Sequence, residues 1–210
     1  MTKIIKINTE TVEKEKILEI AKALQKEEII IYPTDTFYGV GANCFSRKVL
    51  RLIYKIKKRD QAKPISIIIS NRNMVGKLAV DIPDIFWKIT DNLWPGPLTV
   101  VLKASSNLPQ ELLGRGDSIG IRLPEGAWLH ELVEQAGFPL TATSANISGK
   151  VEISNPYEVV KDFQGKVSLI VDGGETQGRI PSTVVDLTSG RPEILREGAV
   201  PFLEIEKQIK

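Results

Sequence analysis

The segment at residues 29–32 contains three isoleucines and a tyrosine, and a proline follows at position 33. Short runs of β-branched and aromatic residues are typical of strands that are buried on both faces, so we expect a central strand here. Pro33 has no N–H for a strand ladder and should end it. Thr34, Asp35 and Thr36 then place three polar side chains at a strand end, where open α/β sheets bind ligands.

Two glycines follow this polar segment. Gly39 and Gly41 allow the backbone to turn sharply or to come close to a bound group. Taken alone, residues 33–41 are equally well explained as an ordinary strand end with a turn. The choice between the two interpretations depends on the rest of the chain.

The other patterns predict helices and strands that interleave. Apolar residues at helical spacing, with suitable caps, predict helices at 10–26, 46–57, 71–78, 84–93, 127–136 and 155–163. Short apolar runs predict strands at 2–8, 65–69, 98–102, 118–123, 140–143, 168–171, 183–187 and 193–196, with a rigid turn at 94–97 and a loop at 107–116. We therefore expect a single α/β domain over residues 1–210, in which helices flank a twisted sheet of mixed parallel and antiparallel strands.

Cysteine and histidine are almost absent from the sequence. Cys44 and His130 are the only ones, which excludes an internal disulfide and a zinc site made of Cys and His. A conventional Cys–His or Ser–His catalytic pair would have to use His130, the only histidine. We expect His130 on the surface of its helix. We predict no metal site made by the protein. No stretch resembles a signal peptide or a membrane span, so we expect a soluble cytoplasmic protein.

Positive charge is concentrated in one segment. Residues 47–63 hold eight lysines and arginines and one acid, a net charge of +7, whereas the whole chain has +2. A basic segment on a mildly acidic body is typical of proteins that bind phosphate or nucleic acid, although a solvated helix face would look the same. Ser46 can cap this helix, which brings Lys57 and Arg59 to its C-terminal end.

Two familiar nucleotide motifs match only in part. The dinucleotide fingerprint would begin at Gly39, but Cys44 stands where its third glycine is needed. The segment 144–150 ends in Gly-Lys, but it starts with serine and Val151 replaces the required Ser or Thr. A nucleotide would therefore have to be held in another way.

Lys57 and Arg59, together with Ser144 and Asn146, could bind a nucleotide instead. Charge-assisted hydrogen bonds to phosphate are stronger than neutral ones, and arginine can contact two oxygens at once. Ser144 and Asn146 follow the expected strand at 140–143 and offer a hydroxyl and an amide without adding charge. Each of these groups is also common as a cap at a strand end.

Eight short motifs occur in a fixed order along the chain. They are Pro-Thr-Asp-Thr-Phe-Tyr-Gly at 33–39, Lys-x-Arg at 57–59, Lys-Pro at 63–64, Pro-Gly-Pro-Leu-Thr at 95–99, Gly-Ile-Arg-Leu-Pro at 120–124, Thr-Ser-Ala-Asn-Ile-Ser-Gly at 143–149, Ser-Thr-Val-Val-Asp at 182–186 and Leu-Arg-Glu-Gly at 195–198. Their joint order resembles the YrdC-like family of threonylcarbamoyl-AMP synthases, which begin the threonylcarbamoyladenosine modification of tRNA. The resemblance covers residues 29–198 and implies a mixed sheet around a deep, positively charged cavity.

The resemblance also implies a reaction and a set of site residues. The reaction joins L-threonine, bicarbonate and ATP into threonylcarbamoyl-AMP and releases pyrophosphate, with Mg²⁺ carried by the nucleotide and with tRNA-modification proteins as partners. The residues implied for ATP are Lys57, Arg59, Lys63, Ser118, Ser144, Asn146 and Arg196, of which Lys57 and Arg59 would be catalytic, and those for L-threonine are Thr34, Arg122 and Ser182. Arg122 offers a fork for the carboxylate of the amino acid, and Thr34 offers a hydroxyl.

Two other functions remain as alternatives. A non-catalytic paralogue would hold tRNA or double-stranded RNA in the basic cavity. Carbamoyl-phosphate chemistry, as in the related domain of hydrogenase-maturation proteins, is less favoured because the zinc-finger and acylphosphatase segments are missing.

Two positions depart from the family pattern. Asp60 places an acid beside Arg59, where many relatives have proline or serine, and Ile68 stands where the longer relatives have a histidine near threonine. The chain ends at Lys210 without the C-terminal domain of those longer relatives. We therefore expect the short, single-domain form.

Overall fold

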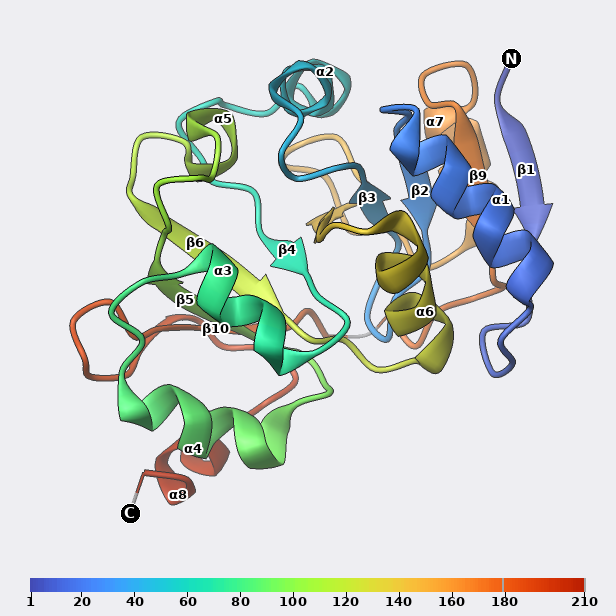
Figure 1. Cartoon of the computed structure of the whole chain (residues 1–210). Helices are drawn as coiled ribbons and strands as arrows, with labels where there is room; N and C mark the ends of the chain where they lie inside the picture. The colour runs from blue at the N-terminus through green and yellow to red at the C-terminus, as the bar shows by residue number, and fades with distance from the viewer. Residues whose placement is uncertain (179, 210) are drawn as a thin grey trace.

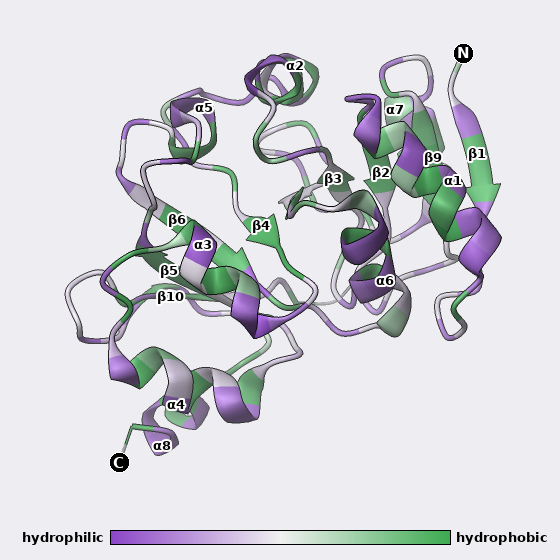
Figure 2. Ribbon diagram, viewed as in Figure 1, coloured by the Kyte–Doolittle hydropathy of each residue, from purple (hydrophilic) through white to green (hydrophobic). Residues whose placement is uncertain are grey.

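The chain folds into two mixed β-sheets with helices around them (Figure 1). This computed structural model describes residues 1–178 and 180–209. The strands of both sheets are largely hydrophobic, whereas helices α1 (Lys14–Gln25) and α4 (Asp84–Leu93) alternate between hydrophobic and hydrophilic residues (Figure 2). Amphipathic helices therefore cover apolar sheets, as the sequence predicted.

The first sheet contains the strand that the sequence placed at its centre. Its order is β1 (Lys3–Lys6), β9 (Leu169–Asp172), β2 (Ile30–Tyr32), β3 (Gly39–Gly41) and β8 (Thr143–Ser144). Strands β1 and β2 run parallel to β9, whereas β3 is antiparallel to both β2 and β8. All three residues of β2 are buried, and Pro33 follows directly. The prediction of a central, doubly covered strand is confirmed.

The second sheet has six strands. Its order is β11 (Glu193–Arg196), β10 (Thr183–Asp186), β5 (Leu98–Lys103), β6 (Ser118–Arg122), β4 (Ile67–Ile68) and β7 (Leu140–Thr141). Two of its pairings, β10 with β5 and β4 with β6, are parallel, and the other three are antiparallel. Parallel and antiparallel pairs occur in both sheets, which confirms the expected mixed α/β fold.

Helices lie around the two sheets (Figure 1). Besides α1 and α4 they are α2 (Arg47–Lys57), η1 (Arg72–Met74), α3 (Val75–Leu78), α5 (Gln110–Leu113), α6 (Ala127–Ala136), α7 (Pro156–Phe163) and α8 (Phe202–Lys207). The buried stripe of α1 is Ile17, Ile20, Ala21 and Leu24, and it packs in one cluster with α6 and with β2 and β9. This stripe has the helical spacing seen in the sequence. The Ser46 side chain accepts the Val49 N–H at 3.4 Å and so caps α2 as expected.

The expected strand at 140–143 is two short strands in different sheets. Its first half, β7, pairs with β4 in the second sheet, and its second half, β8, pairs with β3 in the first. Ala142 lies between them and donates its N–H to the Ser66 carbonyl at 2.7 Å. The chain therefore crosses from one sheet to the other at Ala142. The apolar pattern is the same in both halves, so it could not show this change of partner.

Two short helices and one strand were not predicted. Helix α5 lies within the expected loop at 107–116, and α8 follows the last predicted strand. They have four and six residues, too few for a periodic apolar stripe to be recognised. The strand β3 contains two glycines, which are depleted in strands.

Of the two roles predicted for Gly39 and Gly41, the sharp turn is wrong, because both glycines lie in β3. The other role, close approach of the backbone to a bound group, stays a prediction. The small size of both glycines allows β3 to pack against Tyr32 of the neighbouring strand. A Cβ atom at Gly41 would lie 2.7 Å from Cε1 of Tyr32, and one at Gly39 would lie 3.2 Å from its Cζ. The Tyr32 ring is fully buried, and its hydroxyl donates to the Thr141 carbonyl at 3.0 Å. The glycines thus make room for a ring that links the two sheets.

Replacement of Gly41 by alanine is expected to lower the free energy of unfolding by about 1–3 kcal/mol, the usual cost of overpacking a core. The Tyr32 ring cannot move aside without losing its hydrogen bond. Gly76→Ala is the matched control, since a Cβ atom there would meet no atom within 4 Å and alanine favours a helix. Urea denaturation measures both variants, and equal stabilities would contradict the packing role of Gly41.

Candidate functional site

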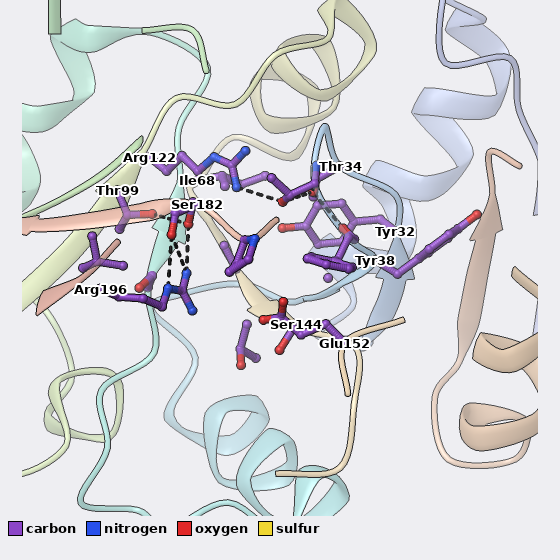
Figure 3. A pocket seen from close by; sticks show the side chains of 18 of the residues that line it. Tyr32, Thr34, Tyr38, Ile68, Thr99, Arg122, Ser144, Glu152, Ser182 and Arg196 are labelled. Carbon is purple, nitrogen blue, oxygen red and sulfur yellow. Dashed lines mark hydrogen bonds between the residues drawn. The ribbon is translucent and has the colours of Figure 1, made fainter. Parts of the chain in front are cut away.

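A pocket of about 860 Å³, measured out to its open mouth, lies between the two sheets (Figure 3). The first sheet contributes Tyr32, Gly39, Thr143 and Ser144 to its lining, and the second contributes Ile68, Thr99, Arg122, Val184 and Arg196. Strand ends and loops from distant parts of the chain therefore meet at one place. This is the position at which the sequence predicted a ligand.

The structure brings most of the predicted site residues together. Those that line the pocket are Thr34, Arg59, Arg122, Ser144, Ser182 and Arg196. Lys57 and Asn146 lie directly behind Ser144, to which both are hydrogen-bonded. Lys63 and Ser118 are not among the lining residues. Lys63 is exposed, and Ser118 lies at the far end of β6, opposite Lys103.

Arg122 is held at the end of β6 by three neighbours. Its Nη2 forms an ion pair with Asp35, its Nη1 donates to the Thr36 hydroxyl at 3.2 Å, and its Nε donates to the Gly96 carbonyl at 3.0 Å. The side chains of Arg122 and Asp35 are 8% and 10% exposed, so this ion pair is buried. An arginine has five N–H groups, and two of them remain for a ligand.

Thr34 shapes the turn that carries Asp35. Its hydroxyl donates to the Phe37 carbonyl at 2.7 Å and accepts the N–H of Thr36 at 3.1 Å. Short local hydrogen bonds of this kind are typical of turns that contain threonine. Asp35 and Thr36 thereby face Arg122. The sequence marked these two residues as polar but gave them no partner.

Ser182 and Arg196 form a second polar group in the pocket. Arg196 donates to the Ser182 carbonyl from Nη2 at 2.8 Å and from Nε at 3.1 Å, and to its hydroxyl at 3.1 Å. That hydroxyl also lies 3.1 Å from the hydroxyl of Thr99. These contacts join β11 and β5 through the residue that precedes β10 (Figure 3).

Lys57 is the last residue of α2, and its ammonium group contacts the loop that follows β8. Its Nζ donates to the Ser144 carbonyl, to the Asn146 carbonyl at 2.8 Å and to the Asn146 side-chain oxygen at 3.1 Å. Lys57 is only 1% exposed. An ammonium group has three donors, and all three are used here. Lys57 therefore fixes the loop that carries Ser144.

Arg59 reaches the pocket because α2 ends in a left-handed turn. Lys58 has φ 50° and caps the helix, and Arg59 then donates from Nη2 to the Pro64 carbonyl at 2.8 Å. Its Nε is buried without a hydrogen-bond partner. The side chain of Asp60 accepts the N–H of Ala62 at 2.9 Å, so this acid stabilises its own turn. Nη1 of Arg59 takes part in none of these hydrogen bonds, so it can donate to an anion in the pocket.

Burial and the positive charge of Arg59 lower the pKa of Lys57 to about 7, against the smaller opposing effect of Glu152. In the unfolded chain the value is near 10.5. Between these two values the unfolded state binds more protons than the folded state, so stability rises with pH. Burial raises the pKa values of Tyr32 and Cys44. Above about pH 9, these two groups therefore make the free energy of unfolding fall as the pH rises.

The free energy of unfolding is therefore expected to rise between pH 7.5 and 9, by up to about 1.4 kcal/mol per pH unit from Lys57. A Lys57→Met variant should lack this contribution. Denaturant unfolding at a series of pH values measures the difference between the two proteins. A difference that does not change with pH would show that the charge of Lys57 is the same in the folded and unfolded states.

Cys44 and His130, the residues that a conventional Cys–His pair would need, do not line the pocket. Cys44 is fully buried, and the ring of His130 contacts the Pro124 carbonyl at 2.7 Å, so the expected surface position of His130 is only partly correct. Within residues 1–178 and 180–209, no group of three or more Cys, His, Asp or Glu side chains is arranged to hold a metal ion. The same part of the chain contains no helix with the length and apolarity needed to span a membrane.

The fold and the site together define a class of protein: an α/β protein with an arginine-lined pocket between two mixed sheets. A model of the Sua5/YciO/YrdC family, described as telomere recombination, matches residues 22–198. The chain belongs to this family, which confirms the resemblance seen in the sequence.

Named relatives agree with this assignment. The threonylcarbamoyl-AMP synthase of Pyrococcus abyssi is 38% identical over 209 residues, which are 100% of this chain and 61% of that protein. A putative threonylcarbamoyl-AMP synthase of Methanocaldococcus jannaschii is 36% identical over 98% of this chain and 96% of its own length. The crystal structure of P. abyssi Sua5 complexed with L-threonine superimposes with a TM-score of 0.95 over 99% of this chain and 61% of that one, at 38% identity.

Proposed function

We propose that this chain is an L-threonylcarbamoyladenylate synthase. It joins L-threonine, bicarbonate and ATP into threonylcarbamoyl-AMP, releases pyrophosphate, and so begins the N6-threonylcarbamoyladenosine modification of tRNA. The observation that carries the proposal is one pocket with two separate arginine sites. Arg122 is anchored by Asp35, and Arg59 lies with Ser144 near the loop held by Lys57. An amino acid and a nucleotide each need such a site.

The threonine site is assigned to the end of β6. The two remaining N–H groups of Arg122 suit the carboxylate of an amino acid, which accepts two parallel hydrogen bonds. Ile68 lies beside Arg122 in the parallel register of β4 and β6 and lines the pocket. It offers an apolar surface to the threonine methyl group in place of the histidine of the longer relatives. Thr34 and Ser182 complete the polar wall.

The phosphates of ATP are assigned to the other side of the pocket. Arg59 provides its guanidinium group and Ser144 its hydroxyl. Arg196 is a second cationic group, and it lies beside Ser182 at the boundary with the threonine site. Lys57 and Asn146 hold the loop that positions Ser144. Lys63 and Ser118 do not line the pocket. They can contact ATP only through a part of the nucleotide that extends beyond the pocket.

The reaction has two steps. The neutral amine of threonine forms a bond to the carbon of bicarbonate, and water leaves, which gives a carbamate. A carbamate oxygen then attacks the α-phosphorus of ATP, and the bond to the β-phosphate breaks, so pyrophosphate leaves with the electron pair. The pocket supplies alignment and positive charge, which stabilise the transition state without a covalent enzyme intermediate. Mg²⁺ bound to the ATP phosphates would neutralise part of their charge.

Pyrophosphate release from ATP by the purified protein tests the proposal. We expect release only when L-threonine and bicarbonate are both present, with serine and glycine as control amino acids. Folded protein that releases no pyrophosphate under these conditions would refute the synthase assignment. The partner proteins of tRNA modification and a cytoplasmic location belong to the same proposal.

The RNA-binding alternative receives less support from the surface. On α2, Arg47 and Arg51 pair with Glu111, and Lys48 pairs with Glu27. Acids therefore neutralise part of the basic face that would bind RNA. Binding of tRNA that weakens steeply with salt, without threonine-dependent pyrophosphate release, would favour this alternative.

A further inference from the structure

Glu152 is the only acidic side chain among the described residues that line the pocket, and three of the other lining residues are arginines. It is half-buried. A pocket that holds phosphates normally excludes carboxylates, because like charges repel each other. The position of Glu152 therefore needs a physical explanation.

The backbone holds Glu152 firmly at this place. Tyr38 accepts the N–H of Ala145 at 2.6 Å on its carbonyl and donates its own N–H to the Ile153 carbonyl at 2.9 Å. Both ends of the intervening loop are thus fixed to one residue beside β3. Ile153 is buried, so the residue before it cannot turn away freely. The two hydrogen bonds of Tyr38 and the burial of Ile153 set the position of Glu152 in the pocket.

This geometry places Glu152 on the phosphate side of the pocket. Figure 3 shows Glu152 and Ser144 together on one side and Arg122 on the other. The negative charge of Glu152 also raises the pKa of Lys57, which contacts the Ser144 carbonyl. The carboxylate is therefore close to the groups assigned to the nucleotide and away from the anchored arginine assigned to threonine.

A carboxylate and a phosphate can share a site when a divalent cation lies between them. Mg²⁺ is commonly bound by one or two carboxylates together with substrate phosphates and water. We propose that Glu152 binds the Mg²⁺ of the MgATP substrate and makes the pocket selective for the metal complex over free ATP. The inference rests on the proposed function, since it requires ATP in this pocket.

Calorimetric titration of ATP tests the inference in excess Mg²⁺ and in EDTA, with the wild-type protein and the Glu152→Gln variant. We expect the substitution to weaken binding of MgATP by about 10- to 100-fold, the usual effect of losing a group that supports a metal. Binding of metal-free ATP should be unchanged or tighter, because a repulsive charge is removed. Glu158→Gln on α7 is the matched control, since this exposed glutamate does not line the pocket.

Two outcomes would overturn the inference, and they are distinguishable. If Glu152→Gln weakens binding equally with and without Mg²⁺, Glu152 acts on the pocket through Lys57 and not through the metal. If the wild-type protein binds ATP in neither condition, the nucleotide assignment itself fails. If Glu152→Gln does not fold, Glu152→Asp replaces it. The aspartate should keep a preference for MgATP, and equal affinities with and without Mg²⁺ would refute the role.

Discussion

Replacement of Lys57 by methionine is expected to lower the rate of threonine-dependent pyrophosphate release by about 10²- to 10³-fold, the scale of losing one preorganised contact at a transition state. Methionine keeps most of the buried stem of Lys57 and removes the three hydrogen bonds to the loop of Ser144 and Asn146. The loop should then lose its fixed position. Steady-state kinetics measures the rate, and hydrogen exchange of residues 144–150 measures the loop without any substrate.

Arg59→Ala separates this indirect role from a direct one. Arg59 lines the pocket and makes no hydrogen bond to the loop, so its loss should lower turnover and leave exchange at 144–150 unchanged. Lys55→Met on the exposed face of α2 is the matched control for the loss of a positive charge. Unchanged turnover in both pocket variants would remove Lys57 and Arg59 from the mechanism. Unchanged exchange in Lys57→Met would show that Lys57 does not hold the loop.

Replacement of Arg122 by alanine should abolish threonine binding, and with it threonine-dependent pyrophosphate release, and should also destabilise the protein by about 3–5 kcal/mol. The large cost arises because Asp35 would remain buried without its counter-ion. Arg72→Ala is the control, since its ion pair with Asp91 is exposed and such pairs contribute about 1 kcal/mol or less. Urea denaturation measures stability, and calorimetry measures threonine binding.

The double variant Asp35→Asn/Arg122→Ala distinguishes the two effects. It removes the uncompensated charge, so it should regain part of the stability and none of the threonine binding. The coupling energy between the two positions should exceed about 1 kcal/mol, as for residues in direct contact. Additive effects would show that Asp35 does not depend on Arg122. Threonine binding by the double variant would remove Arg122 from the threonine site.

Much of the secondary structure could be predicted because local patterns decide it. The stripe of Ile17, Ile20 and Leu24 makes α1 amphipathic in any surroundings, and the run that ends at Tyr32 favours a buried strand. Pro33 ended that strand as expected. The errors lie where the pattern carries no information, as at Ala142, where two halves of one apolar run join different sheets.

The sequence by itself determined the family and several of the polar residues that line the pocket, because ordered motifs such as those containing Arg59, Ser144 and Arg196 are local and specific. It could not assign partners, since ion pairs and hydrogen bonds join residues that are far apart in the chain.

Only the tertiary structure decided that Asp35 anchors Arg122, that Lys57 binds the loop of Asn146, and that Glu152 enters the pocket. The physical reason is that charge and hydrogen-bonding capacity belong to a residue, whereas burial and distance belong to the packing of the two sheets.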